Sequence, residues 1–138
     1  MKTCFIFILT LLAYVPASAQ SMHNTVLRWT SDKAENLKNS EEFQFASIFI
    51  TSPTDVKWLQ KNRQHTTVFS IVSAEGRWSD ISKDGKLLLH VSEKGNGSTG
   101  SILLERTGQI VTISLDFSGL GPNAMKQKFR VTDVQKEN

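Results

Sequence analysis

The sequence predicts an all-β protein with a single antiparallel β-barrel, OB-like or calycin-like, of about eight short strands and at most one short helical turn. Three observations carry this prediction. Segments in which apolar and polar residues alternate recur about every ten residues. Turn residues separate these segments, and the Asp-Gly pair at residues 84–85 is a strong hairpin signal. No helical pattern is long enough for the crossover that joins parallel strands.

The N-terminal residues predict a cleaved secretory signal. Lys2 supplies a positive charge, residues 5–15 form an almost unbroken apolar run, and Ala17 and Ala19 are the small residues that a signal peptidase requires. The apolar run is shorter than the ~20 residues that cross a bilayer. We therefore expect a signal peptide at residues 1–19, a mature domain at residues 20–138 and a secreted or periplasmic location. We expect no membrane insertion after cleavage.

The composition of the mature chain narrows the classes of function. Removing 19 of 138 residues leaves 119, enough for one domain with one hydrophobic core. Cys4, the only cysteine, leaves with the signal, which excludes a disulfide, a thiolate nucleophile and a cysteine metal ligand. Removal of Lys2 leaves 15 basic residues against 13 acidic ones. This near-balance is typical of a solvated surface rather than of a nucleic-acid-binding face.

The mature chain begins with a predicted short strand and a predicted helical turn. Residues 26–29 alternate and form the first strand. Residues 31–38 are the one plausible helical turn, because Asp32 and Glu35 resemble a capping box at its start. The segment is too short to be stable as a helix on its own.

The next predicted strand, residues 43–51, has apolar residues on both faces. Its three phenylalanines lie on one face, while Ile48 and Ile50 lie on the other, which predicts a strand that is buried on both sides or central in the sheet. A tight turn at residues 74–76 separates two later strands. The remaining predicted strands are residues 56–59, 66–73, 77–81, 87–91, 102–106, 109–117 and 127–134.

Alternation also predicts which side chains form the core. In the strand at residues 109–117, the odd-numbered apolar residues from Val111 to Phe117 face inward and Asp116 faces outward. In the last strand, Phe129 faces inward. The three tryptophans each lie beside alternating apolar residues, so we assign all of them to the core rather than to an exposed binding face. They are Trp29, Trp58 and Trp78.

The sequence contains no recognisable catalytic or cofactor motif. The three histidines, His23, His65 and His90, lack the spacing of a zinc site, and no nucleophile elbow surrounds any serine. Residues 80–85 match the first half of a calcium loop, but Val91 stands where the closing acid should be. We therefore expect no enzyme activity, no cofactor and no metal, with calcium at residues 80–85 left open.

Two segments are candidate binding elements, because loops on a rigid β scaffold often carry recognition. The first is a flexible loop at residues 93–101, rich in Gly, Ser and Thr. The second is the N-terminal segment of the mature chain, residues 20–25. The candidate residues are Asn96, Gly97, Ser98 and Thr99 in the loop, and Ser21, Met22, His23 and Asn24 in the N-terminal segment.

The signal that ends at Ala19, the following Gln20 and a cysteine-free barrel of this size resemble the small secreted barrels of Gram-negative bacteria. Within that group, the chain resembles the potempin-like peptidase inhibitors of OB or calycin type, although it lacks the lipidation cysteine that most of them carry. The lipocalin-like ligand binders are a second resemblance. Their G-x-W motif lies near the first strand, and the nearest match here, residues 76–78, lies in mid-chain.

These resemblances imply a non-enzymatic binding protein. The leading expectation is an inhibitor of an exported peptidase, a monomer when free, that presents the loop or the N-terminal segment to the cleft of its target as an extended chain. The first alternative is a lipocalin-like binder of a small apolar ligand. The second is an OB-type binder of nucleic acid or oligosaccharide, although export and the small net charge argue against a nucleic-acid partner.

Overall fold

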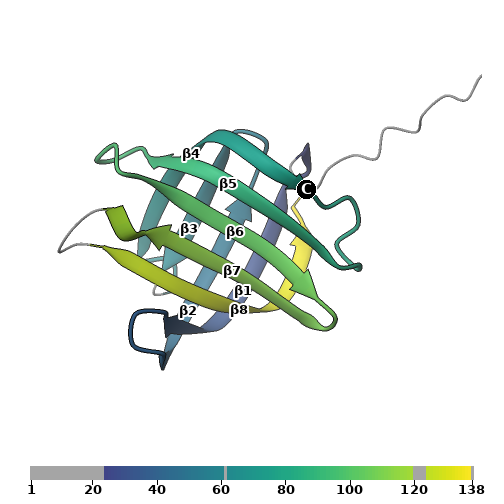
Figure 1. Ribbon diagram of the computed structural model, residues 1–138, viewed down its shortest axis with the longest axis horizontal. Coiled ribbons are helices and arrows are strands. Elements are labelled where there is room, and N and C mark those ends of the chain that lie inside the picture. Colours follow the sequence, from purple (N-terminus) through teal and green to yellow (C-terminus); the bar gives the residue numbers. More distant parts are fainter. Residues whose placement is uncertain (1–23, 61, 120–123, 138) are drawn as a thin grey trace, which may run out of the picture.

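The chain folds into a closed barrel of eight antiparallel strands (Figure 1). The computed structural model describes residues 24–60, 62–119 and 124–137. The predicted signal and three of the N-terminal candidates, Ser21, Met22 and His23, lie outside the described residues. The strands are β1 (Leu27–Asn36), β2 (Glu41–Thr51), β3 (Asp55–Gln60), β4 (His65–Arg77), β5 (Gly85–Glu93), β6 (Thr99–Thr107), β7 (Ile110–Phe117) and β8 (Met125–Lys136).

The connectivity is that of an up-and-down barrel. Each strand pairs with the next one along the chain, and β8 pairs with β1 to close the sheet. An OB-fold instead has five strands in a Greek-key order. The predicted all-β barrel is therefore confirmed, and of the two barrel types the strand order matches the calycin-like one. No helix in the described residues is long and apolar enough to cross a membrane.

The predicted helical turn at residues 31–38 is wrong. Residues up to Asn36 belong to β1, which pairs with β2 on one side and with β8 on the other. A β-bulge at Asp32 shifts the register, so that Ser31 and Ala34 are both buried although they are three residues apart. That spacing resembles a helical period in the sequence, but pairing on both edges outweighs a weak local propensity.

The predicted tight turn at residues 74–76 and the predicted strand at residues 77–81 are also wrong. Residues 74–76 continue β4 and pair with residues 87–89 of β5, after a register shift at Val72. Gly76 has a φ of 96°, a conformation that other residues rarely adopt. In the sequence a glycine at this position suggests a turn, whereas in the structure Gly76 lies within the strand β4.

An aromatic cluster fills the middle of the barrel. The rings of Phe49 and Trp58 are stacked with centroids 5.6 Å apart, and Phe129 meets both rings edge-on at 5.1 and 5.5 Å. Trp58 Nε1 donates a buried hydrogen bond to Ser47 Oγ at 3.0 Å. All three tryptophans are at most 5% exposed, which confirms their assignment to the core. The inward positions predicted for the strand β7 and for Phe129 are confirmed as well.

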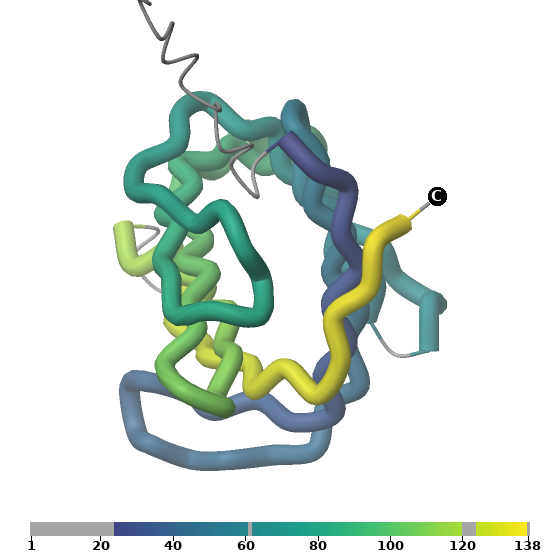
Figure 2. Tube along the Cα trace, turned by 90° about the vertical axis from the view of Figure 1, so that its right-hand side faces the viewer, coloured from purple at the N-terminus to yellow at the C-terminus, as the bar shows by residue number. Residues whose placement is uncertain are grey.

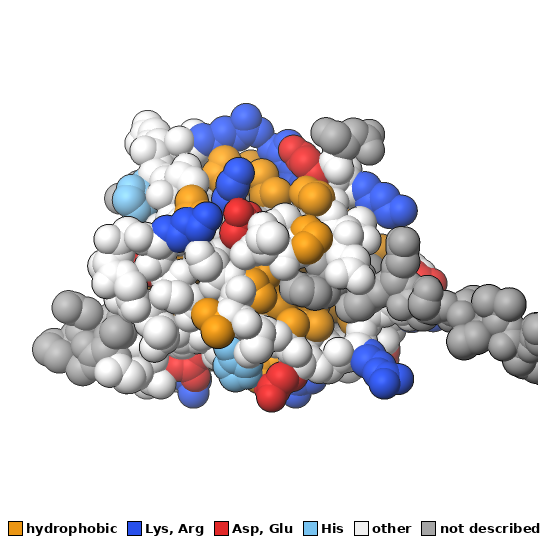
Figure 3. Space-filling view, turned by 90° about the horizontal axis from the view of Figure 1, so that it is seen from above, with side chains coloured by type: hydrophobic (Ala, Val, Ile, Leu, Met, Phe, Trp, Pro, Cys, Tyr) orange, Lys and Arg blue, Asp and Glu red, His pale blue; other side chains and the backbone are white. Residues whose placement is uncertain are grey.

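The outer face of β2 is only partly buried, so of the two expectations for this strand the central position, between β1 and β3, holds and burial on both sides does not. Ile48 and Ile50 point outward and are half-buried beside Leu59 and Lys57 of β3. The space-filling view from above, the side on which β4 and β5 lie uppermost in Figure 1, shows hydrophobic side chains at the surface with basic and acidic side chains among them (Figure 3). No second layer of described residues covers this face, so cross-strand neighbours alone shield the two isoleucines.

One end of the barrel is closed by the connection between β4 and β5. Figure 2 looks onto this end, where the teal connection crosses the ring of strands. Trp78 is buried there against Trp29, with ring centroids 5.8 Å apart. Its Nε1 donates to the carbonyl oxygens of Asp80 and Lys83 at 2.8 and 3.0 Å. The indole therefore anchors residues 78–84 over the end of the core.

Candidate functional site

The opposite end of the barrel is open and contains a cavity of about 300 Å³. Its floor consists of three buried aromatic side chains, Trp58, Phe69 and Phe117, of which the last two pack with ring centroids 5.4 Å apart. The rim consists of four residues that are more exposed than the floor, namely Thr67, Glu93, Asn96 and Met125. An apolar floor with a few polar groups at the edge is the usual composition of a small-molecule site. We call this cavity the mouth.

The candidate loop lies at the rim of the mouth. The turn is shorter than predicted, because β5 runs to Glu93 and β6 begins at Thr99. Glu93 N donates to Ser98 O, and Gly97 N donates to Glu93 O, both at 2.8 Å. Asn96 Oδ1 accepts from Ser98 N at 2.9 Å. The residues expected to form a flexible loop therefore form a compact turn, whose backbone donors at these positions are already used.

The N-terminal candidates and the loop candidates are not brought together. Asn24, the one described residue of the N-terminal set, is exposed and precedes β1 at the end that Trp78 closes. The carbonyl of Val26 accepts from the amide of Glu137, which holds this segment beside the C-terminus. Asn24 and the loop candidates therefore lie at opposite ends of the barrel (Figure 1).

Glu93 is the site residue that the sequence analysis missed. It is the one ionisable residue among the described residues that line the mouth. The alternation in β5 could have identified it, because Leu87, Leu89 and Val91 are all buried and Glu93 is next in the same inward series. The sequence analysis assigned Glu93 to the loop, since two glycines follow it closely.

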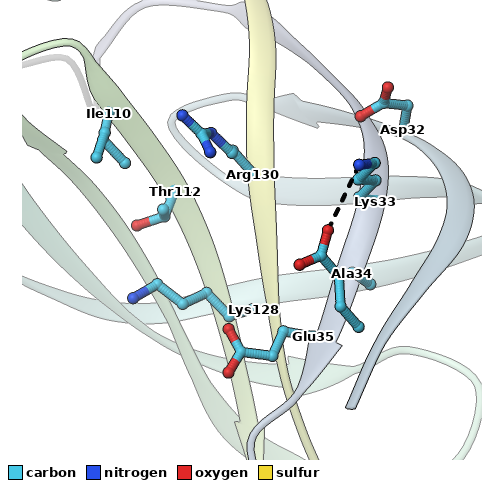
Figure 4. Close-up of a pocket in the computed structure, with 9 residues that line it drawn as sticks. Asp32, Lys33, Ala34, Glu35, Ile110, Thr112, Lys128 and Arg130 are labelled. Atoms are coloured by element: carbon cyan, nitrogen blue, oxygen red, sulfur yellow. Dashed lines mark ion pairs between the residues drawn. The ribbon is translucent and has the colours of Figure 1, made fainter. Parts of the chain in front are cut away.

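A second cavity, of about 440 Å³, lies on the outside of the barrel at the bulge in β1 (Figure 4). Lys128 and Arg130 of β8 flank Thr112, while Lys33 Nζ lies 3.6 Å from Glu42 Oε1. These side chains of both signs stand on a shallow, solvent-exposed surface. This groove lacks the aromatic floor of the mouth, so we do not assign a function to it.

A third cavity, of about 490 Å³, lies on the outer face of β5, β6 and β7. His90 Nε2 lies 3.1 Å from Glu75 Oε2, and Ser101 stands opposite His90 in the register. A histidine between an acid and a serine resembles a hydrolase site. However, no hydrogen bond joins Ser101 to His90 among the described residues, and the histidine side chain is 43% exposed. The arrangement does not build an activated nucleophile.

The same cavity holds a carboxyl group whose pKa is lowered. Hydrogen bonds from Ser118 lower the pKa of Asp116, and the nearby charge of Lys126 adds a smaller effect. Ser118 N lies 3.0 Å from Asp116 Oδ1. Because the folded-state pKa lies below the unfolded one, ionised Asp116 stabilises the fold above its unfolded pKa. That contribution is lost as the pH falls through the folded-state pKa.

Replacing Ser118 with alanine should raise the pKa of Asp116 toward the ordinary value of about 3.9, because the side-chain hydrogen bond is lost while the backbone one stays. Carboxyl carbon NMR during an acid titration measures this pKa directly. Ser114→Ala is the matched control, because Ser114 lies on the outer face of β7, the strand that contains Asp116. An unchanged Asp116 pKa in the Ser118 variant would contradict the assigned cause.

Residues 80–85, which match the first half of a calcium loop, belong to the connection that closes one end of the barrel. Asp80 Oδ1 accepts hydrogen bonds from Ser82 N and Ser82 Oγ at 2.9 and 2.6 Å, so the carboxylate holds the turn in place. Val91, at the position of the missing closing acid, is buried in the core. Within the described residues, no group of three or more His, Cys, Asp or Glu side chains is placed to hold a metal ion.

Comparison of the chain with protein-family models, with curated proteins and with solved structures finds no match. The argument for function therefore rests on the geometry of the mouth, because a fold alone does not specify a function.

Proposed function

We propose that the protein binds a small ligand with an apolar or aromatic body in the mouth of the barrel. One observation carries this proposal: the open end presents a concave floor of aromatic side chains, while the opposite end is sealed by Trp78. Small barrels commonly hold one ligand at such a place. The volume of about 300 Å³ lies at the lower end of the range for small-molecule sites, which favours a compact ligand.

The filled interior limits how deep the ligand can lie. Phe49, Trp58 and Phe129 occupy the middle of the barrel in close contact. A ligand would therefore rest on Trp58, Phe69 and Phe117 near the rim and would not thread through the barrel. This location leaves one side of the ligand exposed to solvent. We further propose that the protein binds its ligand outside the cytoplasm, on the basis of the predicted signal at residues 1–19.

Peptidase inhibition through the loop stays a prediction with weaker support. Pairing along a peptidase cleft needs an extended segment with free backbone donors and acceptors. In this turn the amides of Glu93, Gly97 and Ser98 are already used in internal hydrogen bonds. The loop can therefore offer side chains to a partner, but the extended backbone that the inhibitor mechanism requires would form only after these bonds break.

A pair of variants on neighbouring residues of β4 tests the proposed function. Thr67 points into the mouth, while Thr66 is exposed on the outer face. We expect N-phenylnaphthylamine, a neutral fluorescent probe, to bind the wild-type domain and the Thr66→Trp variant equally well. In Thr67→Trp, the indole should fill the mouth and weaken binding by about tenfold or more, since apolar contact area drives the binding.

Probe fluorescence in a titration gives the affinities, and circular dichroism checks that both variants are folded. Equal affinity in Thr67→Trp and in the wild type would place the probe elsewhere and overturn the proposal. The absence of any binding to the wild-type domain would overturn it as well.

A further inference from the structure

Glu93 introduces the one carboxylate among the described residues that line the mouth. In the register of β4 and β5 it stands directly opposite Phe69, a residue of the floor. We infer that the ligand of the mouth carries a positively charged group that Glu93 binds, attached to the apolar or aromatic body that rests on the floor. This inference rests on the proposed function and adds the chemical class of the ligand, an organic amine or ammonium compound.

Three lysines at this end of the barrel are engaged elsewhere. Lys94, the next residue in the chain, has its Nζ 3.9 Å from Asp55 Oδ2. Lys126 pairs with Asp116 at 3.8 Å, and Lys38 Nζ donates to a backbone carbonyl at 2.7 Å. No ion pair among the described residues includes Glu93. Its charge is therefore left for a ligand to neutralise.

The turn after β5 fixes Glu93 in place. Both its backbone amide and its carbonyl are held at 2.8 Å within the turn, and Lys94 N donates to Val68 O at 2.9 Å. The carboxylate lies against Gly95, where an added Cβ would meet Glu93 Oε1 at 3.8 Å. A carboxylate with little backbone freedom loses little entropy when it binds a cation, so its position favours affinity.

The floor of the mouth adds a second attraction for a cation. An organic cation over the face of an aromatic ring is attracted by the negative potential of the ring quadrupole. Trp58, Phe69 and Phe117 offer such rings next to the carboxylate. An anionic ligand would instead be repelled by Glu93 and by the ring faces, so the mouth discriminates between the two signs of charge.

Three probes with one aromatic body and different charges test the inference: phenethylamine, phenethyl alcohol and phenylacetate. Amide NMR titrations of the domain give both the affinity and the place of binding. We expect the amine to bind about tenfold more tightly than the alcohol, and phenylacetate to bind most weakly. In Glu93→Gln, the preference for the amine over the alcohol should fall to the small remainder that the aromatic rings provide, with the affinity for the alcohol unchanged.

The control variant is Glu35→Gln, which removes an outward glutamate near the same end of the barrel and should leave all three affinities unchanged. Equal affinities of the amine and the alcohol for the wild type would overturn the inference while leaving the proposed function intact. So would a preference for the amine that is undiminished in Glu93→Gln. If none of the three probes shifts the amides of the mouth, the inference fails. The proposed function then depends on the Thr67→Trp result.

Discussion

Replacement of Trp58 by alanine is expected to lower the free energy of unfolding by about 3–5 kcal/mol. Domains of this size are stable by only about 5–15 kcal/mol, so this one change would remove much of the total stability. Trp58 is 5% exposed, stacks on Phe49 and meets Phe129 edge-on. Truncation would leave a cavity between these rings, which the rigid closed sheet cannot collapse to fill.

The same change would also leave a buried polar group without its partner. Ser47 is 3% exposed, and its hydroxyl accepts the hydrogen bond from Trp58 Nε1. Trp58→Phe keeps an aromatic ring in the stack but loses this bond, so it should cost about 1–3 kcal/mol. Urea denaturation followed by far-ultraviolet circular dichroism measures both variants. A cost below ~1 kcal/mol for the alanine variant would show that the ring contributes little to the core.

The sequence predicted the barrel well where strands alternate without interruption. In β7, the inward series from Val111 to Phe117 and the outward Asp116 stand as expected, because both neighbouring strands pair with it in unbroken register. In such a strand successive side chains point to opposite faces, so the order of apolar and polar residues is enough to predict which of them face inward. Alternation also accounts for the burial of Trp29 and Trp58, whereas Trp78 is buried in the connection between β4 and β5, where the predicted strand does not form.

Two of the errors lie where the register shifts. Asp32 is an extra residue against β8 and Val72 against β5, so the inward series changes its parity in the middle of each strand. A single sequence shows this only as a break in alternation, which reads as a helical turn at residues 31–38 and as a tight turn at residues 74–76. Closure of the barrel requires such bends, but they depend on neighbouring strands that are distant in the chain.

The candidate site could be predicted only in part. Asn96 was selected as a loop residue, and it does lie at the rim of the mouth. The mouth itself combines residues from β3, β4, β5, β7 and β8, and their meeting depends on the staggered ends of the strands. Glu93 was missed because its inward position follows from the exact end of β5, and strand ends are the least reliable part of a sequence-based prediction.

The second large effect is expected at Gly85, the first residue of β5. An added Cβ there would collide with the indole of Trp78, which is buried over the closed end of the barrel. Gly85→Ala should therefore displace Trp78 from Trp29, and break its hydrogen bonds to the carbonyls of Asp80 and Lys83. We expect the free energy of unfolding to fall by about 3 kcal/mol, from overpacking and from the lost contacts of the indole.

A double-mutant cycle separates this steric cause from a general effect of alanine. In a Trp78→Ala background the added methyl group meets an empty space, so Gly85→Ala should cost less than about 0.5 kcal/mol there, against about 3 kcal/mol in the wild type. Gly119→Ala is the matched control, because an added Cβ at that position meets no described atom within 4 Å. Equal costs of Gly85→Ala in both backgrounds would show that the indole does not need this glycine. Contacts other than the packing of Trp78 against Gly85 would then have to hold the closed end of the barrel.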